Sequence, residues 1–107
     1  MTENQEMLKD FVVTLLEDKK AEDIAVIDIS GKTTFAKYMI FASGRSVKNI
    51  SSMADAISLE LKHKTNLKVT IEGADNSSWV LVDIGDIMVH LFHPEARQHY
   101  QLEKLWS

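Results

Sequence analysis

Three residues, Gly44-Arg45-Ser46, lie where a strand is expected to give way to a helix. The free backbone amides at the start of a helix attract phosphate, so this turn could bind an anion. A metal-dependent nucleotide transfer would also need two close carboxylates on the following strand, and residues 67–72 carry only one acid. We therefore favour the alternative, a turn followed by a helix that Ser46 caps.

Three acidic residues, Asp28, Glu72 and Asp83, form a second group. They could hold a hard cation through their oxygens if their strands are neighbours. Asp83 and Asp86 also flank an expected turn, where Asp is common because its side chain accepts from nearby backbone amides. We favour carboxylates that cap turns or face solvent, and we predict no metal site.

Two histidines, His90 and His93, lie three residues apart. On a helix this spacing could share a metal, but on a strand it sends the side chains to opposite faces. His90 is therefore expected to be a hydrogen-bonded core or half-exposed residue. No Ser or Thr stands in a known nucleophile motif and cysteine is absent, so the case for covalent catalysis is weak and we name no catalytic residue.

Apolar periodicity predicts the elements that would position these side chains. A hairpin is expected around Ile84-Gly85-Asp86. Its second strand should be central in the sheet, with Met88, His90 and Phe92 on one face. The alternation over 67–72 is typical of an edge strand. The expected helices cover residues 7–16 (with Thr2 and Gln5 in the form of a capping box), 47–64 and 94–103; the expected strands cover 24–29, 38–42, 67–72, 79–83 and 87–92. This order predicts an α/β fold with a mixed sheet and helices on its faces.

Length and composition indicate one globular domain over residues 1–107. The chain is 45% hydrophobic and 26% charged, which are ordinary values for a folded domain. Without cysteine it has no disulfide. The first residues lack the features of a secretion or transit signal, and no apolar run approaches the roughly 20 residues that cross a bilayer. We expect a cytoplasmic protein with no membrane contact.

The charge balance argues against one class of partner. Twelve Lys and Arg against sixteen Asp and Glu give a formal charge of −4. Extensive binding to nucleic acid draws on phosphate contacts from a basic face, which this chain lacks. We expect little direct nucleic-acid contact, whereas docking on a basic protein would be favoured by complementary charge.

Several aromatic and apolar residues near the C-terminus form the last constellation. Tyr100 and Leu102 are two residues apart and cannot share a helix face well. Either these side chains complete the core, or they remain exposed in a patch of the kind that interfaces use. The set is Trp79, Tyr100, Leu102, Leu105 and Trp106.

The same region carries a resemblance to a known family. Its pattern, WVLVD-x-GD-x-x-VH-x-F followed by R-x-x-Y-x-LE-x-LW, resembles the ribosomal silencing factor family, also called the Iojap family. Three further motifs also resemble the family and occur in the family's order. They are Ala21-Glu22-Asp23-Ile24 leading into Ile27-Asp28, then Ala42-Ser43-Gly44-Arg45-Ser46, and then Glu72-Gly73. Together they span nearly the whole chain. One departure is Lys37, where the family usually has an acidic residue, so no role is assigned to that carboxylate.

The resemblance implies a five-stranded mixed sheet related to the nucleotidyltransferase fold, without enzymatic activity or cofactor. It implies a translational repressor that binds ribosomal protein L-fourteen on the large ribosomal subunit and blocks joining of the small subunit when nutrients run short, as in stationary phase. Family members use an apolar, aromatic surface for this contact. Carried over, Trp79 and Tyr100 are the leading contacts, Leu102 and Leu105 are weaker ones, and Trp106 fits a structural role.

Two other hypotheses stay open. One is a nucleotide-binding or reduced nucleotidyltransferase-like enzyme that uses the Gly44-Arg45-Ser46 turn. The other is self-association, because family members can form homodimers and a surface that suits a partner can also pair with itself.

Overall fold

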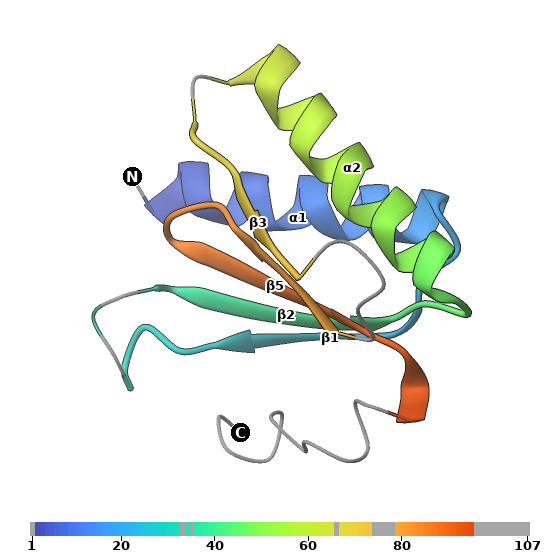
Figure 1. Ribbon diagram of the computed structural model, residues 1–107. Coiled ribbons are helices and arrows are strands. Elements are labelled where there is room, and N and C mark those ends of the chain that lie inside the picture. Colours follow the sequence, from blue (N-terminus) through green and yellow to red (C-terminus); the bar gives the residue numbers. More distant parts are fainter. Residues whose placement is uncertain (1, 33, 35, 66, 74–78, 96–107) are drawn as a thin grey trace.

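The described structure consists of two helices and five strands (Figure 1). The computed structural model describes residues 2–32, 34, 36–65, 67–73 and 79–95, with the backbone alone for residues 2–5. The elements, in order, are α1 (Thr2–Asp18), β1 (Glu22–Asp28), β2 (Tyr38–Ser43), α2 (Val47–Lys64), β3 (Thr70–Glu72), β4 (Trp79–Asp83) and β5 (Ile87–Phe92).

The five strands form one mixed sheet in the order β1-β2-β5-β4-β3. β5 is parallel to β2 and antiparallel to β4, while β1 pairs antiparallel with β2 and β3 antiparallel with β4. The predictions of a central second hairpin strand and of an edge position for β3 are both confirmed. The α/β class with a mixed five-stranded sheet is confirmed as well.

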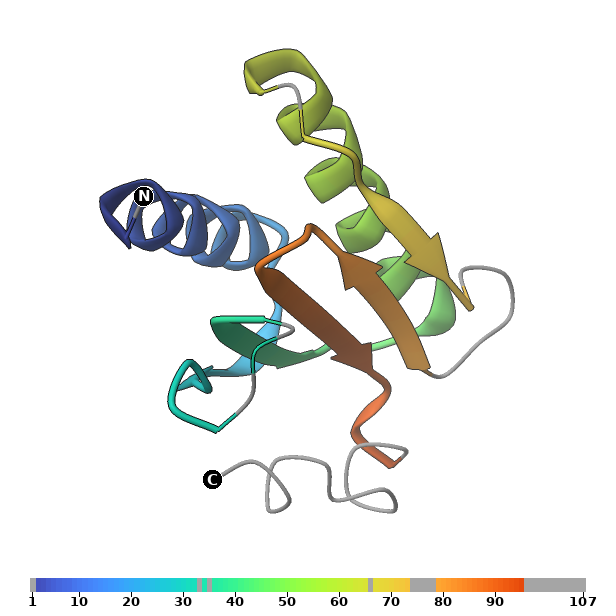
Figure 2. The ribbon, with the colours of Figure 1, turned by 90° about the vertical axis from the view of Figure 1, so that its left-hand side faces the viewer.

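Both described helices cover the same face of the sheet (Figures 1 and 2). The core between the helices and the sheet contains the inward side chains of α1 and α2 and, from each strand, the residues whose side chains face the helices. In β5, for example, Ile87, Val89 and Leu91 belong to this core, whereas Phe92 belongs to a second cluster on the other face. The two-sided burial expected for β5 is therefore present, and it explains why neither face of that strand is polar.

Local sequence accounts for how several elements begin and end. The Ser46 hydroxyl accepts from the Asn49 amide at 3.0 Å, which confirms Ser46 as the cap of α2. The turn between β4 and β5 contains Gly85 at φ +89°, a conformation that glycine adopts without strain, and the Asp83 carboxylate accepts from the Gly85 amide at 2.9 Å.

Lys20 is in the left-handed region at φ +64° just after α1. The Ala21 amide donates to the Leu16 carbonyl at 2.9 Å and the Lys20 amide to the Glu17 carbonyl at 3.0 Å. This is the hydrogen-bond pattern that commonly closes a helix around a left-handed residue, although glycine is the usual occupant.

The starts of two strands differ from the prediction, and the ends of β1 and β2 differ from it by one residue each. β3 begins at Thr70 instead of Leu67 because Thr70 pairs with Asp83, the last residue of β4, so the preceding residues have no β4 residue opposite them. β1 begins at Glu22 instead of Ile24, and its register shifts between Glu22 and Ala25, where Asp23 has φ +51°. An extra residue at an edge is a typical β-bulge, which the periodicity does not reveal.

The helix predicted from Pro94 to Glu103 lies outside the described residues, apart from Pro94 and Glu95. Within the described ranges, neither helix combines the length and the apolar character that crossing a membrane requires.

Candidate docking site

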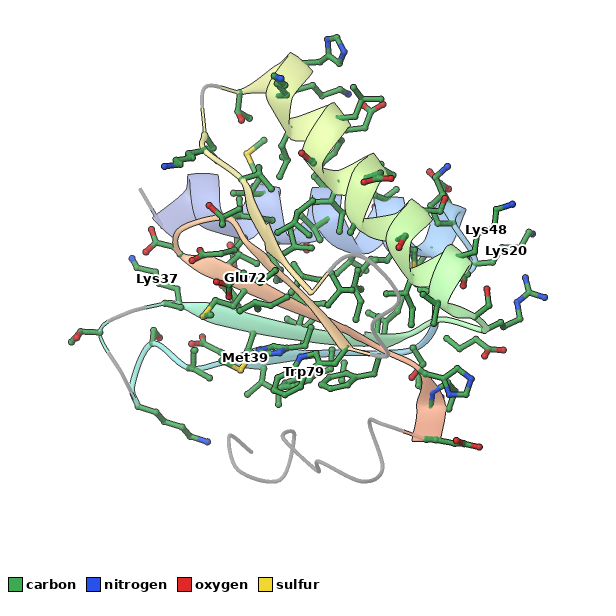
Figure 3. All side chains as sticks on the ribbon, viewed as in Figure 1. Lys20, Lys37, Met39, Lys48, Glu72 and Trp79 are labelled. Atoms are coloured by element: carbon green, nitrogen blue, oxygen red, sulfur yellow. The ribbon has the colours of Figure 1, made fainter. Side chains whose placement is uncertain are left out.

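One face of the sheet, turned away from α1 and α2, gathers most of the described aromatic rings; we call it the aromatic face. Figure 3 shows Trp79 and Met39 projecting from the sheet on this side. Strand register explains the gathering, because Phe41 lies opposite His90, and Trp79 lies opposite Phe92, so the rings come from three adjacent strands. The aromatic face comprises Met39, Phe41, Trp79, Met88, His90 and Phe92.

The rings on this face form a continuous stack. The centroids of Phe41 and His90 are 5.0 Å apart with planes inclined by 13°, and those of His90 and Phe92 are 6.0 Å apart at 11°. Trp79 lies 5.4 Å from Phe92 at 22°. These separations are within the range of favourable aromatic pairs. Phe41 and Phe92 are buried, whereas Trp79 is partly exposed and is therefore the ring that a partner could contact.

His90 contributes the one polar side chain of the stack. Its Nδ1 accepts a hydrogen bond from the indole Nε1 of Trp79 at 3.1 Å. Because Nδ1 is the acceptor, the proton of the neutral ring is on Nε2. Burial lowers the pKa of His90 from 6.5 to about 4, so the ring is neutral at physiological pH.

Within the described part of the chain, the second nitrogen of the His90 ring, Nε2, lacks a hydrogen bond of the kind that Nδ1 has. Nε2 of His90 is buried and has no hydrogen-bond partner among the described residues. An unsatisfied buried donor costs about 1–3 kcal/mol. This cost offsets part of what the bond to Trp79 contributes to stability.

Trp79 lies on the aromatic face and is partly exposed, and its role as a contact stays a prediction. Tyr100, Leu102 and Leu105, the other predicted contacts, lie outside the described residues, as does Trp106. Their role in binding stays a prediction.

His90 was predicted to be a hydrogen-bonded core or half-exposed residue, which agrees with its burial and its bond, but Trp79 was not identified as the donor. The signal was present in the hairpin. With Trp79 opposite Phe92, His90 is two residues away along β5 and is the diagonal neighbour of Trp79 on the same face.

The Gly44-Arg45-Ser46 turn is occupied by its own structure. The Gly44 amide donates to the Phe92 carbonyl at 2.8 Å, and the Arg45 amide donates to the Asn49 side-chain oxygen at 3.1 Å. A Cβ at Gly44 would come within 2.7 Å of Ile50 Cγ1. Glycine is thus needed here for packing against α2, and the favoured interpretation, a turn with a helix cap, agrees with these contacts.

The three acids considered as metal ligands are separated by the strand order. Asp28 is on edge strand β1 and Glu72 on the opposite edge strand β3, while Asp83 ends β4. Asp28 instead accepts from the hydroxyl and the amide of Ser30, and these hydrogen bonds lower the pKa of its carboxyl below the usual value. In the described part of the chain, no group of three or more His, Asp or Glu side chains could hold a metal ion.

Lys37 joins two parts of the fold through its backbone. Its carbonyl accepts from the Ile29 amide at 2.9 Å, and its amide donates to the Asp86 carbonyl at 2.7 Å. These contacts tie the end of β1 to the turn between β4 and β5. They do not depend on the side chain, so a basic residue can stand here as well as an acidic one.

An apolar groove lies on the helix side of the molecule, between α1, the end of α2 and the β4–β5 turn. Its volume is about 720 Å³, and the exposed side chain of Met7 lines it together with Phe11 and Leu67. This groove is a second surface with partly exposed apolar side chains, so it is another place where a partner could bind through apolar contacts.

Comparison with known proteins identifies the family. Residues 2–107 match the family model described as "Ribosomal silencing factor during starvation". Ribosomal silencing factors of Zymomonas mobilis and Bacillus subtilis are 44% and 37% identical to the chain; the alignments cover 95% and 97% of it and 77% and 88% of those proteins. A crystal structure of a Chromobacterium violaceum protein superposes with a TM-score of 0.90 at 33% identity, covering 94% of this chain and 84% of that one. The chain therefore belongs to the ribosomal silencing factor family.

Proposed function

We propose that this protein represses translation by binding the large ribosomal subunit through ribosomal protein L-fourteen and by blocking the joining of the small subunit. The observation that carries the proposal is the family membership over residues 2–107. The mechanism requires affinity and bulk, because two bodies cannot occupy one surface. No chemical step is needed, in keeping with a family described as silencing factors and not as enzymes.

A more distant relative supports the choice of the large subunit. A mouse protein named "Mitochondrial assembly of ribosomal large subunit protein 1" is 36% identical over 101 residues, which are 92% of this chain and 44% of the mouse protein. We infer that the shared domain is the part that recognises a large subunit. The formal charge of −4 favours encounter with a basic ribosomal protein over a grip on RNA phosphates.

We propose that docking uses the part of the aromatic face that is not buried, because Met39, Phe41, His90 and Phe92 are themselves buried. Trp79 is partly exposed at its margin and rests on buried Phe92, so its position is defined before binding. Tryptophans supported in this way are common hot spots of interfaces. We propose that Tyr100 also contacts the partner, with weaker contributions from Leu102 and Leu105, as the family resemblance implies.

The first experiment is co-sedimentation of the purified protein with separated ribosomal subunits, followed by addition of the missing subunit. We expect binding to the large subunit alone and fewer whole ribosomes. Binding to neither subunit, or to the small subunit, would refute the proposal.

Single substitutions then locate the surface. Trp79→Ala or Tyr100→Ala should weaken large-subunit binding by about 2 kcal/mol or more if these residues are hot spots. Met7→Ala is the matched control, since Met7 is an exposed apolar side chain in the groove on the other side of the sheet. Loss of binding in the Met7 variant and not in the Trp79 variant would move the interface to that groove. Circular dichroism confirms that each variant is folded.

The enzymatic alternative predicts nucleotide binding in the presence of magnesium. The Gly44 and Arg45 amides already donate within the protein, so we expect no binding by calorimetry. Self-association of the free protein is compatible with docking through the same surface, and light scattering over a concentration series measures it. A dimer that uses the aromatic face should dissociate when the large subunit is added.

A further inference from the structure

We propose that His90 is a positioning residue for docking: its Nδ1 holds the indole of Trp79 at one tilt on the aromatic face, so that the partner meets a preorganised ring. This inference rests on the proposed function, because it concerns the same surface. It assigns to a buried histidine a role in recognition that packing alone would not give it.

The geometry constrains the Trp79 ring from two directions. Phe92 supports its face, with the ring centroids 5.4 Å apart, but such a stack does not by itself distinguish the two orientations that a half-turn about χ2 would give the indole. The bond from Nε1 to His90 Nδ1, 3.1 Å long, is directional and selects one of the two. The two contacts together define both the plane and the orientation of the indole.

His90 is itself held firmly enough to act as a reference point. It is 7% exposed, it stacks on Phe41 at 5.0 Å, and its strand is paired on both sides. A change of the His90 χ1 rotamer would break the bond to Trp79 and the stack with Phe41 together. His90, at the centre of the sheet, thus fixes the orientation of Trp79 at the partly exposed margin of the aromatic face.

The energetic argument favours recognition over stability. A histidine with one buried, unsatisfied N–H among the described residues is a poor choice for a core position that an apolar ring could fill. Fixing a side chain before association avoids part of the entropy that binding would otherwise cost. The benefit of the bond should therefore appear in affinity for the partner.

Two variants separate the hydrogen bond from the ring stack. His90→Phe keeps an aromatic ring against Phe41 and Phe92 but has no acceptor for the indole. His90→Asn keeps an acceptor oxygen near the place of Nδ1 but loses the ring. Trp79→Phe provides the reciprocal change, since it keeps an aromatic ring and removes the donor.

The first readout is the proton resonance of the Trp79 indole N–H in the free protein. The chain has two tryptophans, and the resonance absent from Trp79→Phe identifies Trp79. In the unaltered protein we expect a low-field signal that exchanges slowly with solvent. His90→Phe should move it toward the value of a solvated indole, and His90→Asn should preserve part of the effect. An unchanged signal in folded His90→Phe would overturn the proposal.

The second readout is large-subunit binding by the same variants. We expect His90→Phe to weaken binding about tenfold, a change of about 1.4 kcal/mol, with partial recovery in His90→Asn. The double variant should lose less than the sum of the two single losses, because both changes remove the same bond, while Trp79→Phe also removes indole contact with the partner. Full additivity, or unchanged binding in His90→Phe with an altered indole signal, would refute a role in recognition. If Trp79→Phe and Trp79→Ala both bind normally, the proposed docking surface fails, whatever the resonance shows.

Discussion

Acidification should destabilise this protein through His90. Burial lowers the pKa of this side chain from 6.5 to about 4, so the folded protein keeps it neutral while the unfolded chain protonates it. Between these two values the unfolded state binds more protons than the folded state. The free energy of unfolding should therefore fall as the pH decreases from 6.5 toward 4, with no further loss from this residue below 4.

The size of the effect follows from the two pKa values. A tenfold change in proton affinity is worth about 1.4 kcal/mol, so the fall from 6.5 to about 4 amounts to about 3 kcal/mol in full. By about pH 5 the loss should reach about 2 kcal/mol, since the unfolded chain is then almost fully protonated at this residue. Such a loss is a large part of the stability of an ordinary small domain, which is about 5–15 kcal/mol.

Urea unfolding at about pH 7.5 and about pH 5 measures this loss, with His90→Phe as the reference protein. Phenylalanine has a similar ring and does not titrate, whereas the other three histidines and all carboxylates are common to both proteins. We expect the unaltered protein to lose about 2 kcal/mol more than the variant between the two conditions. Equal losses would refute the reasoning, because they would mean that His90 is as free to take up a proton in the folded state as in the unfolded one.

Two further predictions concern backbone positions. Lys20→Gly should raise the free energy of unfolding by about 1 kcal/mol, because a residue with a side chain is strained at the left-handed φ of +64° and glycine is not; thermal unfolding measures this, and a decrease would contradict the helix end described above. Gly44→Ala should lower the free energy of unfolding by about 1–3 kcal/mol, because the new Cβ would overlap Ile50 and Met53. If the unaltered protein did bind a nucleotide and a stable Gly44→Ala protein did not, the hypothesis of a nucleotide site at this turn would be supported instead.

Local patterns predicted the elements well because each has a local physical cause. The hairpin follows from apolar strands around Gly85, and the start of α2 follows from the ability of Ser46 to accept from Asn49. The start of β3 could not be found in the same way. Its alternation extends back to Leu67, but strand pairing also needs a partner, and β4 ends opposite Thr70.

The candidate site shows the same division. Trp79 was predicted as a contact from the family resemblance, and its place on a face with Phe92 follows from hairpin register. The contribution of Phe41 depends on β2 pairing with β5, which joins segments far apart in the sequence. Sequence order also could not show that Asp28 and Glu72 belong to opposite edges of the sheet, which separates two of the acids that were considered as metal ligands.

The parallel pairing of β2 with β5 also affects when a newly made copy can act. β1 and β2 can pair once residue 43 has been synthesised, but the other edge of β2 stays open until residues 87–92 arrive. Closing a loop of roughly forty residues costs chain entropy before the strand pairing can stabilise the fold, so the pairing of β2 with β5 should form late and slowly. Trp79 can stack on Phe92 only after β5 has been synthesised. A protein that is proposed to restrain ribosomes therefore cannot take its docking shape until its own translation has passed residue 92.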